Sequence, residues 1–357
     1  MVFKTESFIK KSVRRLSPYK INKIPLGVGI KLDANESNYT LPPRMAREYA
    51  NFLKGTLINL YPDSEYDKLV KSLEDFFKID SGNFIFGNGS DELILTILLS
   101  LDRDVAVNIP EPSFSMYKII AAYNDLKINS IKLKRDDFDL PPDTGRAKKG
   151  RNIFFLSCPN NPTGNYFNPG ILKRLINDKN NVVVIDEAYI DFSGRETFIP
   201  YVKNNDNLIV LKTFSKIGMA GLRFGMLFAG ERLLNEFKKI KLPFNVNSLT
   251  LKSIEFFLDN FSYFEKNIKR TVKERKRVYN HLARLDFLEA YPSEANFIFI
   301  RLKKASYATK FDTFLKKNGI IVRGFEGELA NFFRVSIGSN SENTALTGCL
   351  ELFQQNI

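Results

Sequence analysis

The sequence predicts an α/β protein in which a large domain with a mainly parallel central sheet precedes a smaller α+β C-terminal domain. Two observations carry this prediction. From about residue 82 to 230, short apolar runs alternate with longer amphipathic runs, a pattern typical of helices packed around a parallel sheet. After residue 230 the pattern changes to one long helical stretch, followed by further strands and helices. That change is typical of a separate α+β domain.

In the large domain, five apolar runs have the length and composition of buried strands. They are 105–109, 152–157, 182–185, 208–211 and 224–229. Three segments between them have helical spacing, namely 91–101, 114–123 and 169–178. The segment 136–150 is polar and contains Pro and Gly, so a loop is expected there.

Beyond the large domain, residues 248–285 have the spacing of a long helix. Predicted strands and helices then follow at 296–302, 305–317, 320–323, 332–337 and 341–355. The first forty or so residues hold few periodic signals. We therefore divide the chain into an N-terminal segment, 1–45, a large domain, 46–240, and a small domain, 241–357.

The composition is that of an ordinary soluble protein, with 357 residues of which 44% are hydrophobic and 26% charged. Cys158 and Cys349 are too few for a disulfide framework or a structural zinc site. His281, the one histidine, lies in a charged helical stretch, so no metal site is predicted. The N-terminus lacks the apolar core of a signal peptide, and no stretch approaches the roughly 20 apolar residues of a spanning helix. A cytoplasmic protein without a membrane partner is expected.

The net charge is +13. The Lys and Arg residues are scattered, and no aromatic-interleaved basic stripe or nucleic-acid motif accompanies them. A nucleic-acid partner is therefore not predicted. An electrostatic field that attracts phosphorylated small molecules is favoured instead.

The first chemical signal lies in residues 211–225. Lys216 follows an apolar strand and two hydroxyl residues, Thr213 and Ser215, and Arg223 comes shortly after. A lysine amine can form a Schiff base with an aldehyde cofactor when it is accessible and partly desolvated. Hydroxyls and an arginine suit a phosphate. Taken alone, Lys216 is equally compatible with a surface lysine in a strand-to-loop turn.

Asp186 ends the predicted strand 182–185, at the sheet edge where ligands bind in open α/β folds. A carboxylate buried there needs a cationic partner. A protonated pyridine nitrogen is such a partner, and the charge turns the ring into an electron sink. The alternative is an ordinary helix N-cap after a strand.

Two turns complete the pattern. Asn161, in 157–164, and Tyr189 are candidate donors to the phenolic oxygen of such a cofactor, although Asn-Pro and Thr-Gly are also ordinary turn dipeptides. In 84–92, a glycine-containing turn opens a helix, whose first N–H groups can hold a phosphate. It is not a dinucleotide fingerprint, because Glu92 stands where a third glycine is required.

These motifs, in this order, resemble those of the fold-type I PLP-dependent aminotransferases. The resemblance implies an aspartate aminotransferase-like fold and pyridoxal 5′-phosphate (PLP) as the cofactor, held mainly by residues 46–240. Its implied catalytic residues are Lys216, which forms the Schiff base and moves the substrate's Cα proton, Asp186 at the pyridine nitrogen, and Tyr189, which with Asn161 contacts the phenolic oxygen. The other implied cofactor contacts are the stacking ring of Phe114 and the phosphate-region residues Ser90, Asp91, Thr213, Ser215 and Arg223.

Within that family, residues 13–19, 31–36 and 59–63 are most similar to those of histidinol-phosphate aminotransferases. The resemblance implies a homodimer with shared active sites, in which residues 1–45 contribute to the small domain and to dimer contacts and Tyr61 is lent to the partner's PLP phosphate. It places Tyr19, Asn35, Arg323 and Arg334 at the substrate. The implied reaction converts histidinol phosphate and 2-oxoglutarate to imidazole acetol phosphate and glutamate, a step of histidine biosynthesis.

Two features depart from the family pattern: residues 35–38 read Asn-Glu-Ser-Asn without the usual proline, and the interval from Lys216 to Arg223 is short for the class. Two alternatives share the cofactor. An aromatic amino-acid aminotransferase would use Arg334 for a carboxylate, and a threonine-phosphate decarboxylase would use much the same phosphate site. A third alternative is a PLP-binding regulator fused to a DNA-binding module, but the first forty residues show no helix-turn-helix pattern.

Overall fold

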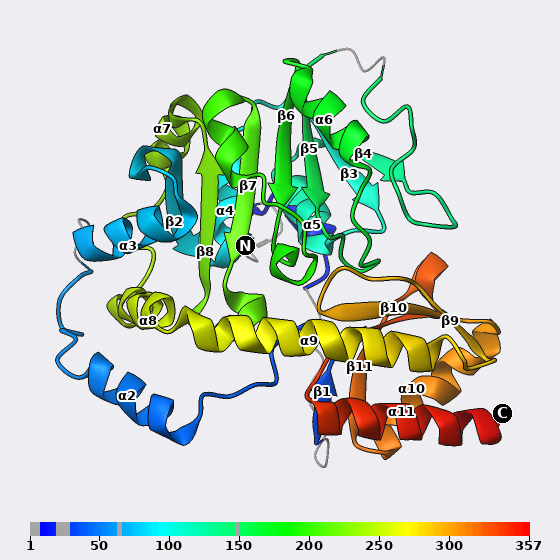
Figure 1. The fold of residues 1–357 in the computed structure, drawn as a ribbon. Coiled ribbons are helices and arrows are strands. Elements are labelled where there is room, and N and C mark those ends of the chain that lie inside the picture. The colour runs from blue at the N-terminus through cyan, green and yellow to red at the C-terminus, as the bar shows by residue number, and fades with distance from the viewer. Residues whose placement is uncertain (1–7, 19–28, 63–65, 147–149) are drawn as a thin grey trace, which may run out of the picture.

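The computed structural model describes residues 8–18, 29–62, 66–146 and 150–357. Figure 1 shows a large α/β part above the long helix α9 (Phe261–Leu282), and a smaller sheet near the C-terminal half of that helix. The predicted fold class is confirmed. Within these ranges, no helix is long and apolar enough to cross a membrane.

The larger sheet has seven strands among the described residues, in the order β2-β8-β7-β6-β5-β3-β4. All neighbours are parallel except at β8, which runs antiparallel to both β2 and β7. The strands are β2 (Phe84–Asn88), β3 (Ala106–Glu111), β4 (Lys127–Lys132), β5 (Asn152–Ser157), β6 (Asn181–Asp186), β7 (Leu208–Thr213) and β8 (Phe224–Ala229).

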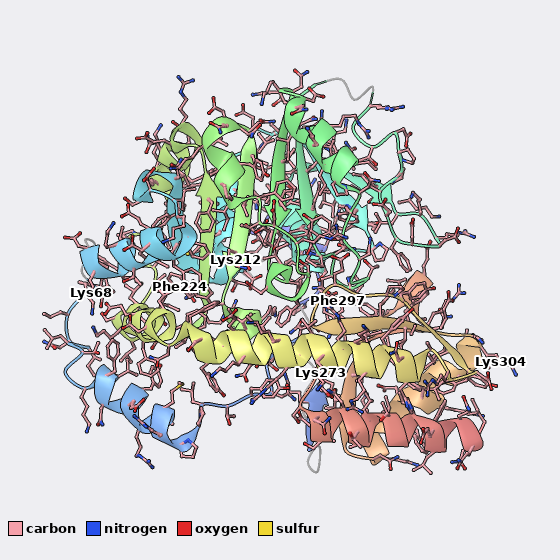
Figure 2. The ribbon with its side chains drawn as sticks, in the orientation of Figure 1. Lys68, Lys212, Phe224, Lys273, Phe297 and Lys304 are labelled. Carbon is pink, nitrogen blue, oxygen red and sulfur yellow. The ribbon has the colours of Figure 1, made fainter. Side chains whose placement is uncertain are left out.

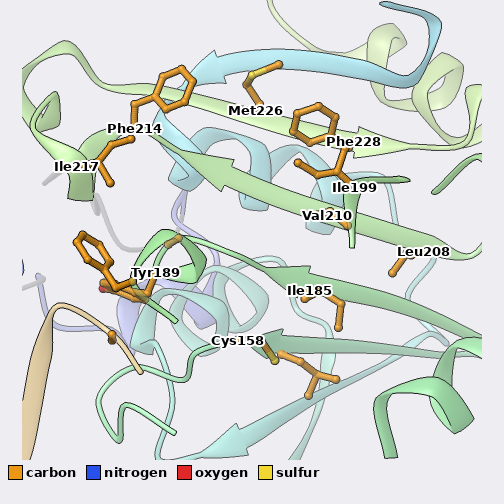
Figure 3. Close-up of a cluster of buried hydrophobic side chains, with 14 of the residues drawn as sticks. Cys158, Ile185, Tyr189, Ile199, Leu208, Val210, Phe214, Ile217, Met226 and Phe228 are labelled. Atoms are coloured by element: carbon orange, nitrogen blue, oxygen red, sulfur yellow. The ribbon is translucent and has the colours of Figure 1, made fainter. Parts of the chain in front are cut away.

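The central strands are buried on both faces because their alternate residues enter two separate apolar clusters. On β7, Val210 belongs to one cluster and Ile209 to the other. Figure 3 shows the first cluster, in which Ile185, Val210 and Phe228 from three neighbouring strands pack together. Helices cover both faces: α3 (Asp67–Phe77) and α6 (Pro169–Asn177) on the first cluster, α4 (Gly89–Leu99), α5 (Ser115–Tyr123) and α7 (Glu231–Ile240) on the second.

The smaller sheet has the order β1-β11-β12-β10-β9. Its first strand comes from the N-terminal segment and pairs in parallel with β11, whereas the other pairs are antiparallel. The strands are β1 (Ile30–Leu32), β9 (Leu288–Ala290), β10 (Phe297–Leu302), β11 (Ile320–Gly324) and β12 (Phe332–Ser336). The helices α10 (Ala308–Lys317) and α11 (Asn340–Gln355) contribute to its apolar cluster. The short helix α1 (Lys11–Arg14) and the helix α2 (Pro43–Leu53) precede α3 in the sequence.

The long helix expected at 248–285 is wrong in one respect, because it is two helices. The first, α8 (Ser248–Asp259), ends at Asn260, and α9 begins at the next residue. Asn260 leaves the helical conformation, and its side chain donates to the carbonyl of Phe256 at 2.9 Å. An asparagine side chain that bonds the carbonyl four residues earlier competes with helix propagation. The domain boundaries at 45 and 240 stay a prediction.

Candidate active site

Two adjoining cavities lie at the carboxyl edge of the large sheet. The larger measures 360 Å³ and the smaller 80 Å³. Four side chains line both, namely Phe114, Asn161, Tyr189 and Lys216. The parallel strands β5, β6 and β7 all end here, which brings residues far apart in the sequence to one edge. The predicted site residues on these strand ends are therefore gathered in one place.

Lys216 lies in the 3₁₀ turn Ser215–Ile217, which is separated from the end of β7 by one residue, Phe214. Its Nζ is 3.5 Å from the carbonyl oxygen of Ala34. Burial, together with the positive charge of Arg334, lowers the pKa of Lys216 to about 8. A lysine with such a pKa is partly neutral near physiological pH, and the neutral amine is the nucleophile.

Asp186 is the last residue of β6 and is buried. Burial raises its pKa, while hydrogen bonds from Tyr117 and from the backbone of Ala188 act in the opposite direction. The Tyr117 hydroxyl donates to Oδ2 at 2.5 Å, and the Ala188 N–H donates to Oδ1 at 3.1 Å. Burial and the charge of Asp186 raise the pKa of Tyr117 well above its usual value, so Tyr117 stays a donor.

Sequence reasoning did not find Tyr117. The signal is its position one helical turn after Phe114, since residues three apart lie on the same helix face. The two rings meet edge to face with centroids 5.4 Å apart. Phe114 lines both cavities, and Tyr117 reaches the carboxylate of Asp186, which lines the smaller one.

The lining of the smaller cavity includes the polar residues Ser90, Asp91, Thr213, Ser215 and Arg223. Arg223 donates to the Asp91 carboxylate at 2.8 Å. Gly89, with φ of 78°, opens α4 against this guanidinium, and a Cβ at that position would lie 2.7 Å from Arg223 Nη2. Only glycine lets the helix start and the arginine approach this closely. Hydroxyls, a helix N-terminus and a guanidinium together suit a phosphate.

The larger cavity is lined by two arginines of the small sheet, Arg323 and Arg334. They are directly opposite each other on β11 and β12, so both side chains leave the same face. Arg334 is nearly buried, and its Nη1 and Nη2 donate to Asn161 Oδ1 and to the carbonyl of Asp33, each at 2.6 Å. The sequence alone did not establish that Arg323 reaches the cavity, and the pairing of the two strands places it there.

The two sheets meet at Phe297, at the start of β10 (Figure 2). Its ring packs edge to face on Tyr189 with centroids 5.1 Å apart, and the guanidinium of Arg334 lies 5.5 Å from it. Tyr189 accepts hydrogen bonds from Asn35 at 3.0 Å and from Asn161 at 3.3 Å. Residues of the small sheet and the N-terminal segment thus complete a site that begins on the large sheet.

One predicted site residue, Tyr61, lies away from both cavities. Tyr61 is 80% exposed, stacks on Phe244 with centroids 4.8 Å apart, and lines neither cavity of its own chain. Tyr19 lies outside the described residues.

The donor set fits PLP. The buried carboxylate of Asp186, which lines the smaller cavity, can pair with a pyridinium, and the hydroxyls and Arg223 in the same lining can hold a phosphate. Lys216 and the ring of Phe114 lie at the boundary with the larger cavity. The arrangement can therefore hold a flat, phosphorylated aldehyde beside a second space with two cations.

Residues 22–349 match the family described as aminotransferase class I and II, and the chain belongs to this family and is an aminotransferase. The chain is 37% identical over 327 residues to the histidinol-phosphate aminotransferase of Pyrococcus furiosus, covering 91% of this chain and 92% of that one. It is 34% identical over 354 residues to that of Vesicomyosocius okutanii, covering 97% and 98%.

Solved structures share the fold. The histidinol-phosphate aminotransferase of Sinorhizobium meliloti in complex with pyridoxal-5′-phosphate has a TM-score of 0.85 at 21% identity, covering 98% of each chain. The L-threonine-O-3-phosphate decarboxylase of Porphyromonas gingivalis has a TM-score of 0.79 at 23% identity, covering 91% of this chain and 99% of that one. The family and this fold support the predicted cofactor, PLP.

Proposed function

We propose that the protein transfers the amino group of histidinol phosphate to 2-oxoglutarate, using PLP held by Lys216. The observation that carries this proposal is the position of Lys216 between a phosphate-suited cavity and a cavity with two arginines. Relatives named histidinol-phosphate aminotransferase, similar along almost the whole chain, support the choice of substrate.

Lys216 has two tasks in this reaction. Its amine holds the cofactor covalently until the substrate amine takes its place, and it then carries a proton away from the substrate Cα. The lowered pKa of Lys216, about 8, favours both tasks because the neutral amine is the nucleophile and the base. Bound PLP supplies an electron sink for the negative charge that develops at Cα.

The other residues bind and orient. Asp186, kept acceptor-only by the donors Tyr117 and Ala188, pairs with the pyridine nitrogen. Tyr189 and Asn161 contact the phenolic oxygen. Arg323 and Arg334 bind the substrate phosphate and, in the second half-reaction, the carboxylate of 2-oxoglutarate, because a planar guanidinium serves both anions.

A single-turnover titration tests the substrate. PLP-loaded protein is mixed separately with histidinol phosphate, phenylalanine and threonine phosphate, and the cofactor absorbance is followed. We expect fast conversion to the aminated cofactor with histidinol phosphate and slow conversion with phenylalanine. A preference for phenylalanine would make the protein an aromatic aminotransferase, and carbon dioxide release from threonine phosphate would make it a decarboxylase.

We further propose that the enzyme is a cytoplasmic homodimer in which Tyr61 serves the partner's site. Tyr61 is exposed in a cluster with Leu57, Ile58 and Leu60. Exposed apolar side chains grouped in this way favour a protein interface, and two copies related by a two-fold axis would bury the same patch twice.

A mixing experiment tests the shared site. Tyr61→Ala and Lys216→Ala proteins, each of low activity, are combined under conditions that exchange subunits. In a hybrid, one site keeps Lys216 from the first protein and Tyr61 from the second, so activity should return. If Tyr61 served its own chain, mixing would restore nothing.

A further inference from the structure

Asn35 uses every polar group that it has. It lies just after β1, is 1% exposed, and has a φ of 56°. Its N–H donates to Ser336 Oγ at 2.9 Å, and its carbonyl accepts from Asn296 Nδ2 at 2.9 Å. Its Oδ1 accepts from Ser336 Oγ at 3.0 Å, and its Nδ2 donates to the Tyr189 hydroxyl at 3.0 Å. These bonds therefore fix the side chain of Asn35, a residue that also lines the larger cavity.

The direction of these bonds follows from their chemistry. Because Ser336 Oγ accepts the N–H of Asn35, its own hydrogen is available for Asn35 Oδ1. The oxygen of the amide must then face Ser336, and the NH₂ group must face Tyr189. The amide of Asn35 is thus oriented as a donor to the tyrosine.

A second amide is fixed in the same way. Arg334 carries only donors, so Asn161 must turn its oxygen toward the guanidinium, 2.6 Å away. The NH₂ group of Asn161 then faces Tyr189 at 3.3 Å. Tyr189 therefore accepts two hydrogen bonds, which occupy both acceptor positions of a hydroxyl. The Tyr189 hydroxyl can then act toward a further partner only as a donor, through its own O–H.

We propose that Asn35 is a positioning residue which, with Asn161, obliges Tyr189 to donate its hydroxyl proton to the phenolic oxygen of bound PLP. The inference rests on the proposed function and replaces the expectation that Asn35 binds the substrate. Ser336 and Arg334 lie two apart on β12 and so leave the same face of the strand. Strand β12 thus carries both Arg334 and Ser336, and Ser336 orients the amide of Asn35 toward Tyr189.

Asn35→Gly tests this directly. Glycine adopts a φ of 56° without strain, so the backbone at this position is kept while the donor is lost. A less strictly oriented tyrosine stabilises the phenolic oxyanion less. The midpoint of the spectral pH titration of the covalently bound cofactor should therefore rise by about half a pH unit to one unit. The charged groups that line the two cavities are the same in both proteins, namely Lys31, Asp33, Asp91, Asp186, Lys216, Arg223, Arg323 and Arg334.

Asn38→Gly is the matched control. Asn38 lies in the same segment and donates to Glu342 of α11 at 2.7 Å, without contact to Tyr189. The spectral titration midpoint of Asn38→Gly should match that of the wild type. In steady-state kinetics, Asn35→Gly should lower kcat about three- to tenfold and leave KM within about twofold. A raised KM with an unshifted midpoint would assign Asn35 to substrate binding and overturn the proposal.

Two further proteins keep the test decisive. Ser336→Ala frees the amide of Asn35 to turn, so a smaller shift in the same direction is expected even if Asn35→Gly does not fold. In a Tyr189→Phe background, Asn35→Gly should shift the midpoint no further, since its effect passes through the lost hydroxyl. An undiminished shift there would refute the mechanism. If the wild type fails to bind PLP, the proposed function itself fails; if it binds but Asn35→Gly titrates like the wild type, only this inference fails.

Discussion

Replacing Tyr117 with Phe removes one oxygen atom and, with it, the shortest hydrogen bond to Asp186. The ring is fully buried and packs on Phe155 with centroids 5.1 Å apart, so phenylalanine can occupy the same space. The lost bond is 2.5 Å long, and it is a hydrogen bond to a charged group when Asp186 is ionised. Such hydrogen bonds contribute about 1.5–3 kcal/mol. The Ala188 N–H remains as a donor to the other carboxylate oxygen.

Without the Tyr117 donor, Asp186 is held less firmly in the ionised form that pairs with a pyridinium. Since about 1.4 kcal/mol is a tenfold change in an equilibrium constant, PLP should bind about 10- to 100-fold more weakly. Equilibrium titration of the apoprotein with PLP, followed by absorbance, measures this. Tyr123→Phe is the control, because Tyr123 ends the same helix and does not contact Asp186. An affinity for PLP within twofold of the wild type would refute the reasoning.

Three other predictions follow from the site and the fold. Because the pKa of Lys216 is lowered from 10.5 to about 8, the unfolded chain binds more protons than the folded chain between these two pH values. The loss of stability that comes from burying the charged ammonium should therefore decrease as the pH rises. The apoprotein with Lys216→Met should therefore melt above the wild type at pH 7 by more than at pH 10, and an equal gap at both would contradict this. Arg334→Lys should lower kcat/KM for histidinol phosphate about 10- to 100-fold in steady-state assays, since lysine replaces the two guanidinium nitrogens that bond Asn161 and Asp33 with a single nitrogen. An unchanged value would exclude a role for the planar guanidinium. Ser339→Ala removes the capping box of α11 and should lower the free energy of unfolding by about 1 kcal/mol in urea denaturation, whereas no loss would show that the cap is dispensable.

Much of the large sheet could be predicted because each strand carries its own signal. The runs 153–156, 208–211 and 224–229 are apolar without interruption, as is typical of strands buried on both faces. The short or polar strands gave no such signal. β4 lies at the sheet edge and has a mostly polar sequence. β1 is three residues long, and it forms a strand by pairing with β11, which lies near the other end of the sequence.

The sequence by itself determined the chemistry of the site. Lys216, Asp186 and Asn161 follow apolar strands, and the ends of neighbouring parallel strands must meet at one edge. Only the tertiary structure decided which groups surround them. Tyr117 bonds Asp186, which is 69 positions further along the chain. Asn35 bonds Tyr189, which is 154 positions further along the chain. Such contacts depend on side-chain direction and on the docking of one sheet against the other, and neither has a local pattern in the chain.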